Sequence, residues 1–362
     1  MKSMKFRGTL AVTLLSSLLL ATFAVPDLVP GVEAAKSGDK KKISKLKKTV
    51  KKLKRQLLTQ RPILVPVTTP VPFIEMVTVG NAGNAADSTT YGAVSYEYQI
   101  GKYEVTLDQY AAFLNAVAKA DASQPTGLYD TNMASDMNSA GIARSGSNAN
   151  YVYTVFGGGE RPVTYVNWFN AARFCNWLHN GRPTGLQDAS TTEDGAYPLN
   201  GTTSGVEISR NAGAKYWIPS EDEWYKAAYH DPRSEGEGGP VGDDNYWLYP
   251  TASETAPGNV IGAEAYRANF KDTVFTVTQS ASYVGSINYL TAVGAYPGSS
   301  SFHGTFDQGG NVYEWNDTVI VSSRGMRGGS WGFNEDDLRS SDRLRNAPFN
   351  EDNDIGFRIA SP

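Results

Sequence analysis

The chain has 362 residues, of which 40% are hydrophobic and 11% aromatic, so it has enough apolar material for the packed core of a globular, soluble protein. Its 36 glycines favour long ordered loops and argue against a helical bundle. The net charge is only −4, but residues 36–55 hold eleven Lys or Arg and one Asp. This basic segment therefore has a charge of +10, and all other residues together sum to −14.

Residues 1–35 have the pattern of an export signal. Basic residues precede an apolar run over residues 10–25, and Val32-Glu33-Ala34 is a candidate cleavage site. The alternative is a membrane anchor, but the run is shorter than the about 20 apolar residues that span a bilayer. We expect an exported protein in the periplasm, at the cell surface or in the medium. Cys175 is the only cysteine, so we expect no internal disulfide.

Residues 36–58 carry an apolar seam set among lysines, with alternate spacings of three and four: Ile43, Leu46, Val50, Leu53 and Leu57. This pattern predicts a coiled-coil-like stalk that oligomerises the chain, or a basic arm on an anionic envelope surface or polysaccharide. The alternative is a solvated, partly helical linker. We expect no nucleic-acid partner for an exported chain, although the charge alone would permit phosphate contacts. The proline-rich residues 59–72 predict a stiff linker, followed by one globular domain over residues 73–362.

Within that domain, residues 73–79 and 96–103 are typical of strands. Three helices follow from capping and spacing. Thr106 and Gln109 form a capping box ahead of an apolar stripe, and Ser220 and Glu223 form another. Between them, a stripe over residues 171–178 ends at Gly181. The polar residues 121–159 predict a long functional loop or one decorated by short strands. Cys175 lies on an apolar face and is expected to be an inert core residue.

Two catalytic patterns are not supported. Residues 328–332 match G-x-S-x-G, the nucleophile elbow of an esterase fold, which would make Ser330 a nucleophile. In that fold the catalytic histidine follows the serine in the sequence. All three histidines, His179, His230 and His303, precede Ser330. The histidines are also scattered without the spacing of a zinc site, so no imidazole metal site is expected.

Oxygen ligands make a better case. Asp307 and Glu314 are seven residues apart with a glycine-rich turn between them, which could aim backbone carbonyls inward while two carboxylates neutralise a divalent cation. Calcium prefers this set of hard oxygens. The alternative is that Asp307 caps a turn and Glu314 pairs with an arginine such as Arg327.

Three runs occur in order near the C-terminal end: Gly-Asn-Val-Tyr-Glu-Trp at 310–315, Arg-Gly-Gly-Ser-Trp at 327–331 and Gly-Phe-Arg at 356–358. Together they resemble the signature of the sulfatase-modifying-factor, or formylglycine-generating-enzyme, family, and the resemblance extends to about residue 73. It implies a single α+β domain with a C-type-lectin-like fold of short strands, few helices and long loops. It also implies two calcium sites, with ligands at Asp307, Gly310, Val312 and Glu314, and at Asn269, Phe270, Asn288 and Leu290.

The resemblance also shows a departure. Formylglycine-generating enzymes hold copper with two cysteines, and these positions are Phe333 and Leu338 here, so copper and formylglycine chemistry are not expected. The resemblance also implies a substrate cleft whose positions are kept here: Ser330, Trp331, Arg339, Ser341 and Arg343. The guanidinium groups among them suit recognition of a carboxylate, a sulfate or a peptide. Arg339 and Arg343 could equally brace the fold, and Arg358 is expected to brace the core.

The sequence therefore predicts an exported, calcium-braced binding or structural module for a peptide or glycan. The alternative is a metal-dependent oxidase or protein-maturation enzyme of the same family that uses residues other than cysteine.

Overall fold

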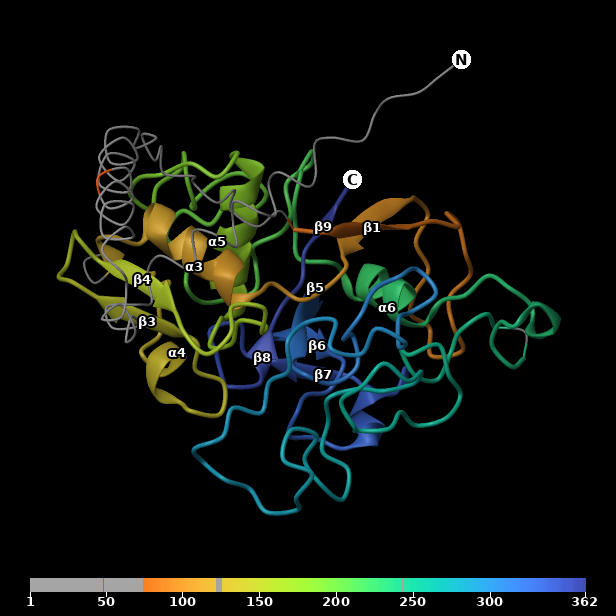
Figure 1. Cartoon of the computed structure of the whole chain (residues 1–362). Helices are drawn as coiled ribbons and strands as arrows, with labels where there is room; N and C mark the ends of the chain where they lie inside the picture. Colours follow the sequence, from red (N-terminus) through yellow and green to blue (C-terminus); the bar gives the residue numbers. More distant parts are fainter. Residues whose placement is uncertain (1–47, 49–73, 122–125, 243) are drawn as a thin grey trace, which may run out of the picture. The chain divides into compact units, whose positions relative to one another are not determined.

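The computed structural model describes residues 48, 74–121, 126–242 and 244–362 (Figure 1). The predicted export signal, stalk and linker lie outside the described residues except for Lys48, and they stay predictions. Of the two units into which the chain divides, Met1–Thr68 and Thr69–Pro362, the account below concerns the second. In the described part, no helix is both long enough and apolar enough to cross a bilayer.

In the described residues, short strands form three small sheets. Two contain β1 (Met76–Val79), β2 (Tyr98–Gly101) and β9 (Ala360–Ser361), and β3 (Ile142–Ser145) with β4 (Val152–Val155). The third has the order β7 (Leu344–Asn346), β6 (Ser323–Arg327), β5 (Tyr313–Ile320), β8 (Ile355–Gly356), and only its β5–β8 pair is parallel. The strands expected near residues 73–79 and 96–103 are β1 and β2.

The three predicted helices are present. The helix α3 (Leu107–Val117) begins at the Thr106–Gln109 capping box, α6 (Glu221–Tyr229) begins at the Ser220–Glu223 box, and α5 (Trp168–His179) is capped by Asn167. Three single turns also occur: α4 (Asn132–Ser135), η2 (Glu235–Glu237) and η3 (Glu335–Leu338). The polar residues 121–159 carry α4 and the β3–β4 hairpin, as expected for a decorated loop.

An aromatic core joins the helices to the C-terminal segment. Phe174 of α5 lies 5.4 Å from Phe113 of α3 and 5.5 Å from Phe357, measured between ring centres. In Figure 1, α3 and α5 lie together on one flank of the four-stranded sheet, and α6 lies beside β5. Cys175 is buried in this core, and burial raises the pKa of its thiol well above its usual range, which keeps the thiol protonated and inert.

Candidate functional site

A buried ion pair lies at the centre of the C-terminal loops. Arg358 donates from Nε and Nη2 to the two carboxylate oxygens of Glu314, both at 2.6 Å, and both side chains are fully buried. Trp224 Nε1 also donates to Glu314 at 2.7 Å, and the remaining donors of Arg358 reach the carbonyls of Gly101 and Phe306. Glu314 thus pairs with an arginine, which is Arg358 rather than Arg327, and Arg358 braces the core.

Two further carboxylates lie next to this pair. Asp307 accepts a hydrogen bond from the backbone N–H of Gly294 at 2.6 Å, and Glu104 Oε1 accepts one from Asn311 Nδ2 at 3.1 Å. Burial, followed by repulsion from Asp307, raises the pKa of Glu104 well above its usual range, and burial raises the pKa of Asp307 to about 6. Three buried acids therefore share one arginine.

The second predicted ligand set lies beside the first. Asn269 and Gly310 form a parallel bridge, and the N–H of Asn311 donates to the Asn269 carbonyl at 2.7 Å. The oxygens of this set already accept protein hydrogen bonds. The Phe270 carbonyl accepts from Thr276 Oγ1 at 2.9 Å, and Asn288 Oδ1 accepts from the N–H of Leu290 at 3.0 Å.

The residues that the resemblance assigns to the family cleft are held by contacts within the protein. Ser330 is fully buried and donates to Asp354 Oδ2 at 2.9 Å, and burial raises the pKa of Asp354 to about 6. The indole of Trp331 stacks on Tyr289 with ring centres 4.8 Å apart. At the two copper-cysteine positions, Phe333 is 44% exposed, whereas Leu338 is fully buried in an apolar cluster with Tyr249, Ala268 and Phe270.

The predicted arginines do not meet in one place. Arg343 forms a two-pronged ion pair with Glu221 at 2.7 and 2.6 Å, and the buried Arg327 binds the same carboxylate. Arg339 instead pairs with Asp336 and donates to Tyr249 Oη, and its side chain stays 42% exposed. Ser341 is exposed. Arg343 and Arg327 thus bind one carboxylate, and Arg339 is the more exposed of the two predicted groove arginines.

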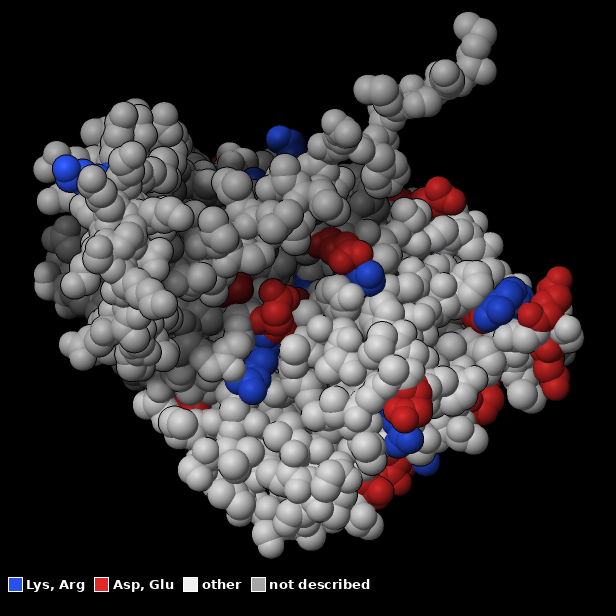
Figure 2. All heavy atoms as spheres, viewed as in Figure 1, with Lys and Arg blue, Asp and Glu red and all other residues white. Residues whose placement is uncertain are grey.

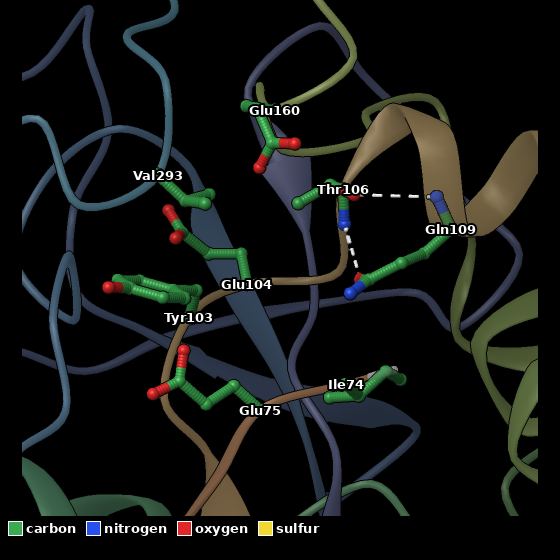
Figure 3. Close-up of a pocket in the computed structure, with 8 residues that line it drawn as sticks. All are labelled: Ile74, Glu75, Tyr103, Glu104, Thr106, Gln109, Glu160 and Val293. Carbon is green, nitrogen blue, oxygen red and sulfur yellow. Dashed lines mark hydrogen bonds between the residues drawn. The ribbon is translucent and has the colours of Figure 1, made fainter. Parts of the chain in front are cut away.

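A hollow that sequence reasoning missed opens in front of Glu104. This acidic pocket has a volume of about 140 Å³ and is lined by Ile74, Glu75, Tyr103, Glu104, Thr106, Gln109, Glu160 and Val293 (Figure 3). Figure 2 shows acidic side chains around a hollow in the middle of the face in view, with basic side chains next to them. The sequence signal for this pocket was the charge of Glu104 at the end of a predicted strand. Several of the other lining residues are distant from Glu104 in the sequence.

Two histidines that looked scattered in the sequence are neighbours. His230 Nδ1 lies 3.4 Å from His303 Nε2, the two ring planes differ by 10°, and His230 is 2% exposed. Burial and the charge of Lys226 lower the pKa of His230 to about 4. Burial, with the neighbouring His230, lowers the pKa of His303 to about 3. Both rings are therefore neutral at pH 7.

Together these features define a loop-rich α+β domain whose C-terminal third is tied by buried ion pairs and stacked aromatics. A family model described as "Sulfatase-modifying factor enzyme 1-like domain" matches residues 74–362. The chain belongs to the sulfatase-modifying-factor family, and the expected formylglycine-generating-enzyme fold is confirmed.

The solved structures that resemble this chain include the following three. The crystal structure of CarF shares 20% identity, covers 81% of this chain and 99% of that chain, and has a TM-score of 0.47. Treponema denticola variable protein 1 shares 19% identity over 79% of this chain and 94% of that chain, with a TM-score of 0.42. PvdO from Pseudomonas aeruginosa shares 16% identity over 79% and 91%, with a TM-score of 0.39. No curated protein matches.

Proposed function

We propose that this protein is an exported binding module of the sulfatase-modifying-factor family for a peptide or glycan, without formylglycine-generating activity. One observation carries the proposal: the two positions that bind copper in the enzymes hold Phe333 and Leu338, and Leu338 is packed in an apolar cluster. A phenyl ring and an isobutyl group offer no donor to a metal ion and no thiol for redox exchange.

The cleft residues suit recognition better than turnover. Ser330 and Trp331 are buried and are held by Asp354 and Tyr289, so they give a rigid base to the residues exposed near them. Phe333 presents an exposed ring that can stack on a sugar face or a peptide side chain, and Arg339 offers a guanidinium group to a carboxylate or sulfate. Rigid aromatic surfaces lose little entropy when a ligand binds.

The test is oxygen-dependent oxidation of a cysteine-containing peptide by the purified, copper-loaded protein, followed by mass spectrometry. We expect no aldehyde product and no oxygen consumption above that of the Phe333→Ala variant. Formation of formylglycine at a rate proportional to protein concentration would overturn the proposal. An array of glycans and peptides, probed with the protein and with Phe333→Ala, measures the binding function itself.

We also propose a calcium ion at Asp307, and the residues present fit it only in part. Asp307 and the carbonyls of Gly310 and Val312 remain as candidate ligands, whereas both oxygens of Glu314 are engaged by Arg358. In the described residues, no three His, Cys, Asp or Glu side chains are grouped as metal ligands. A site with one carboxylate binds calcium weakly, because affinity follows ligand charge.

Thermal unfolding checks the calcium proposal. A ligand that prefers the native state raises its stability, so adding millimolar calcium should raise the melting temperature and a chelator should reverse the rise. The Asp307→Asn variant should lose the response. An identical melting temperature with calcium and with chelator, at fixed protein concentration, would contradict the proposal. For the second ligand set, the matched variant is Asn288→Ala.

A metal-dependent oxidase or maturation enzyme that uses other residues is the second candidate. The observation in its favour is the Ser330–Asp354 hydrogen bond in the family cleft, where a carboxyl group with a pKa of about 6 could move a proton near neutral pH. Metal analysis separates the two candidates: stoichiometric iron or copper in the purified protein supports the enzyme, and calcium alone supports the module.

We propose that the basic residues 36–58 tether or oligomerise the exported chain. Their support is the charge of +10 over residues 36–55 and the apolar seam. Light scattering of the mature chain measures its oligomeric state, and sedimentation with anionic vesicles measures tethering. A monomer that does not sediment with anionic vesicles at low salt would refute both roles.

A further inference from the structure

We infer that the acidic pocket binds a cationic side chain, the ammonium group of a lysine or the guanidinium group of an arginine in a peptide or protein. The inference rests on the proposed binding function and names a ligand class for it. None of the predicted groove residues Ser330, Trp331, Arg339, Ser341 and Arg343 lines this pocket.

The first observation is an unpaired carboxylate oxygen. Glu104 is 1% exposed and lines the pocket, and its Oε2 atom has no hydrogen-bond partner among the described residues. A buried polar atom in a native protein almost always has a partner, and an unpaired one is costly. Oε1 is held by Asn311, so the side chain is anchored while Oε2 is left for a donor from the pocket.

The second observation is an excess of acidic groups over cationic ones. Glu104, Asp307 and Glu314 lie together, and the buried Arg358 is committed to Glu314 through two hydrogen bonds of 2.6 Å. At the rim, Glu75 is paired with Lys102 at 2.8 Å on the surface. Glu160 adds another carboxylate to the lining. Five carboxyl groups thus lie near two cationic groups, and a cation in the pocket would favour the ionised form of Glu104.

The nearby Arg161 does not correct this balance. Its Nε donates to the Leu290 carbonyl at 3.0 Å, and its Nη1 donates to the Gly157 carbonyl. Lys102 lies over the ring of Tyr103 at 5.3 Å from the ring centre while it binds Glu75. Arg161 is therefore bound to backbone carbonyls and Lys102 to Glu75 at the rim, and neither is paired with Glu104.

The third observation is the mixed chemistry of the walls. Figure 3 shows the carboxylates of Glu75, Glu104 and Glu160 arranged around one space, with Val293, Ile74 and the Tyr103 ring among them. A lysine or arginine side chain has an apolar stem and a charged end, and it buries the stem along apolar surface. A cavity of about 140 Å³ can take such a stem and its head.

The walls are also held in place before binding. Thr106 and Gln109 form the capping box of α3, in which each side chain accepts a hydrogen bond from the other residue's backbone N–H at 3.3 and 2.9 Å. A preformed pocket loses little ordering entropy on binding, which favours affinity.

The experiment titrates the full mature protein with the peptide acetyl-Gly-Lys-Gly-amide by calorimetry at low salt. The control peptide carries acetyl-lysine, which keeps the stem and removes the charge. We expect binding of the lysine peptide, at least about tenfold weaker binding of the acetylated one, and a similar loss for the Glu104→Gln variant. Glu97→Gln removes an exposed acid that lines a different hollow and should leave the affinity unchanged.

Each other outcome overturns the inference. These outcomes are no binding of the lysine peptide by the wild type, equal binding of the acetylated peptide, or unchanged affinity in a folded Glu104→Gln variant. Glu160→Gln serves as a second variant if Glu104→Gln does not fold. If calcium alone stabilises the protein and Glu104→Gln abolishes that effect, the pocket serves a metal ion instead. Failure of the proposed function would be seen in other experiments. The copper-loaded protein would oxidise the cysteine peptide, or the array would show no ligand whose binding depends on Phe333.

Discussion

Replacing Arg358 by methionine tests whether the C-terminal loops depend on its charge. The substitution keeps much of the apolar volume of the side chain but leaves Glu314, Glu104 and Asp307 buried without a counter-ion. Removing one partner of a fully buried ion pair costs about 3–5 kcal/mol. For a domain of this size, each kcal/mol shifts the melting temperature by roughly 2–4 °C, so we expect a fall of about 6–20 °C.

Urea unfolding and thermal melts of the same samples measure the effect. The control is Arg339→Met, because Arg339 forms an exposed pair with Asp336 and should cost about 0–1 kcal/mol. In the double variant Arg358→Met with Glu314→Leu, the stranded carboxylate is gone, so stability should partly return. A single-variant loss below about 1 kcal/mol, or a double variant no more stable than the single one, would refute the charge argument.

Three further predictions concern acid, packing and the cleft. His230 and His303 are neutral in the fold with pKa values of about 4 and 3, whereas the unfolded chain takes up protons below about 6.5. The histidine contribution to stability is therefore complete above pH 6.5 and falls as the pH drops toward 4. The charge of Lys226 adds to this loss, and the charge of Asp231 opposes it. The urea midpoint should fall between pH 7.5 and 5, and less so for His303→Gln. Leu338→Ala should cost about 2–5 kcal/mol in urea unfolding, since it empties a buried position. Phe333→Ala should change stability by less than about 1 kcal/mol but abolish ligand binding on the array.

Local signals were readable from the sequence, and distant pairings were not. The helix starts at Thr106 and Ser220 follow from residues three positions apart, so α3 and α6 could be predicted. Glu104 and Asn311 are 207 residues apart, and His230 and His303 are 73 apart. No periodicity links such residues, so only the fold reveals the acidic pocket and the histidine pair.

Motif reasoning named the right loops but not each partner. The motifs identified Glu314 and Arg358 as important charges. They did not decide whether Glu314 binds calcium or pairs with an arginine such as Arg327. The structure pairs Arg327 with Glu221 and Arg358 with Glu314, although Glu314 and Arg327 stand opposite each other on β5 and β6. Strands of two residues, such as β8 and β9, are too short to show any alternation.

The last segment completes structures begun near the start of the domain. Strand β9 pairs with β2, the carbonyl of Phe357 accepts from the N–H of Val105, and Arg358 reaches the carbonyl of Gly101. A chain that emerges N-terminus first from a ribosome or a translocation channel cannot close this domain until residues 357–361 are free. Its folding is therefore a late event, and until then its exposed aromatic residues depend on whatever shields nascent chains in that compartment.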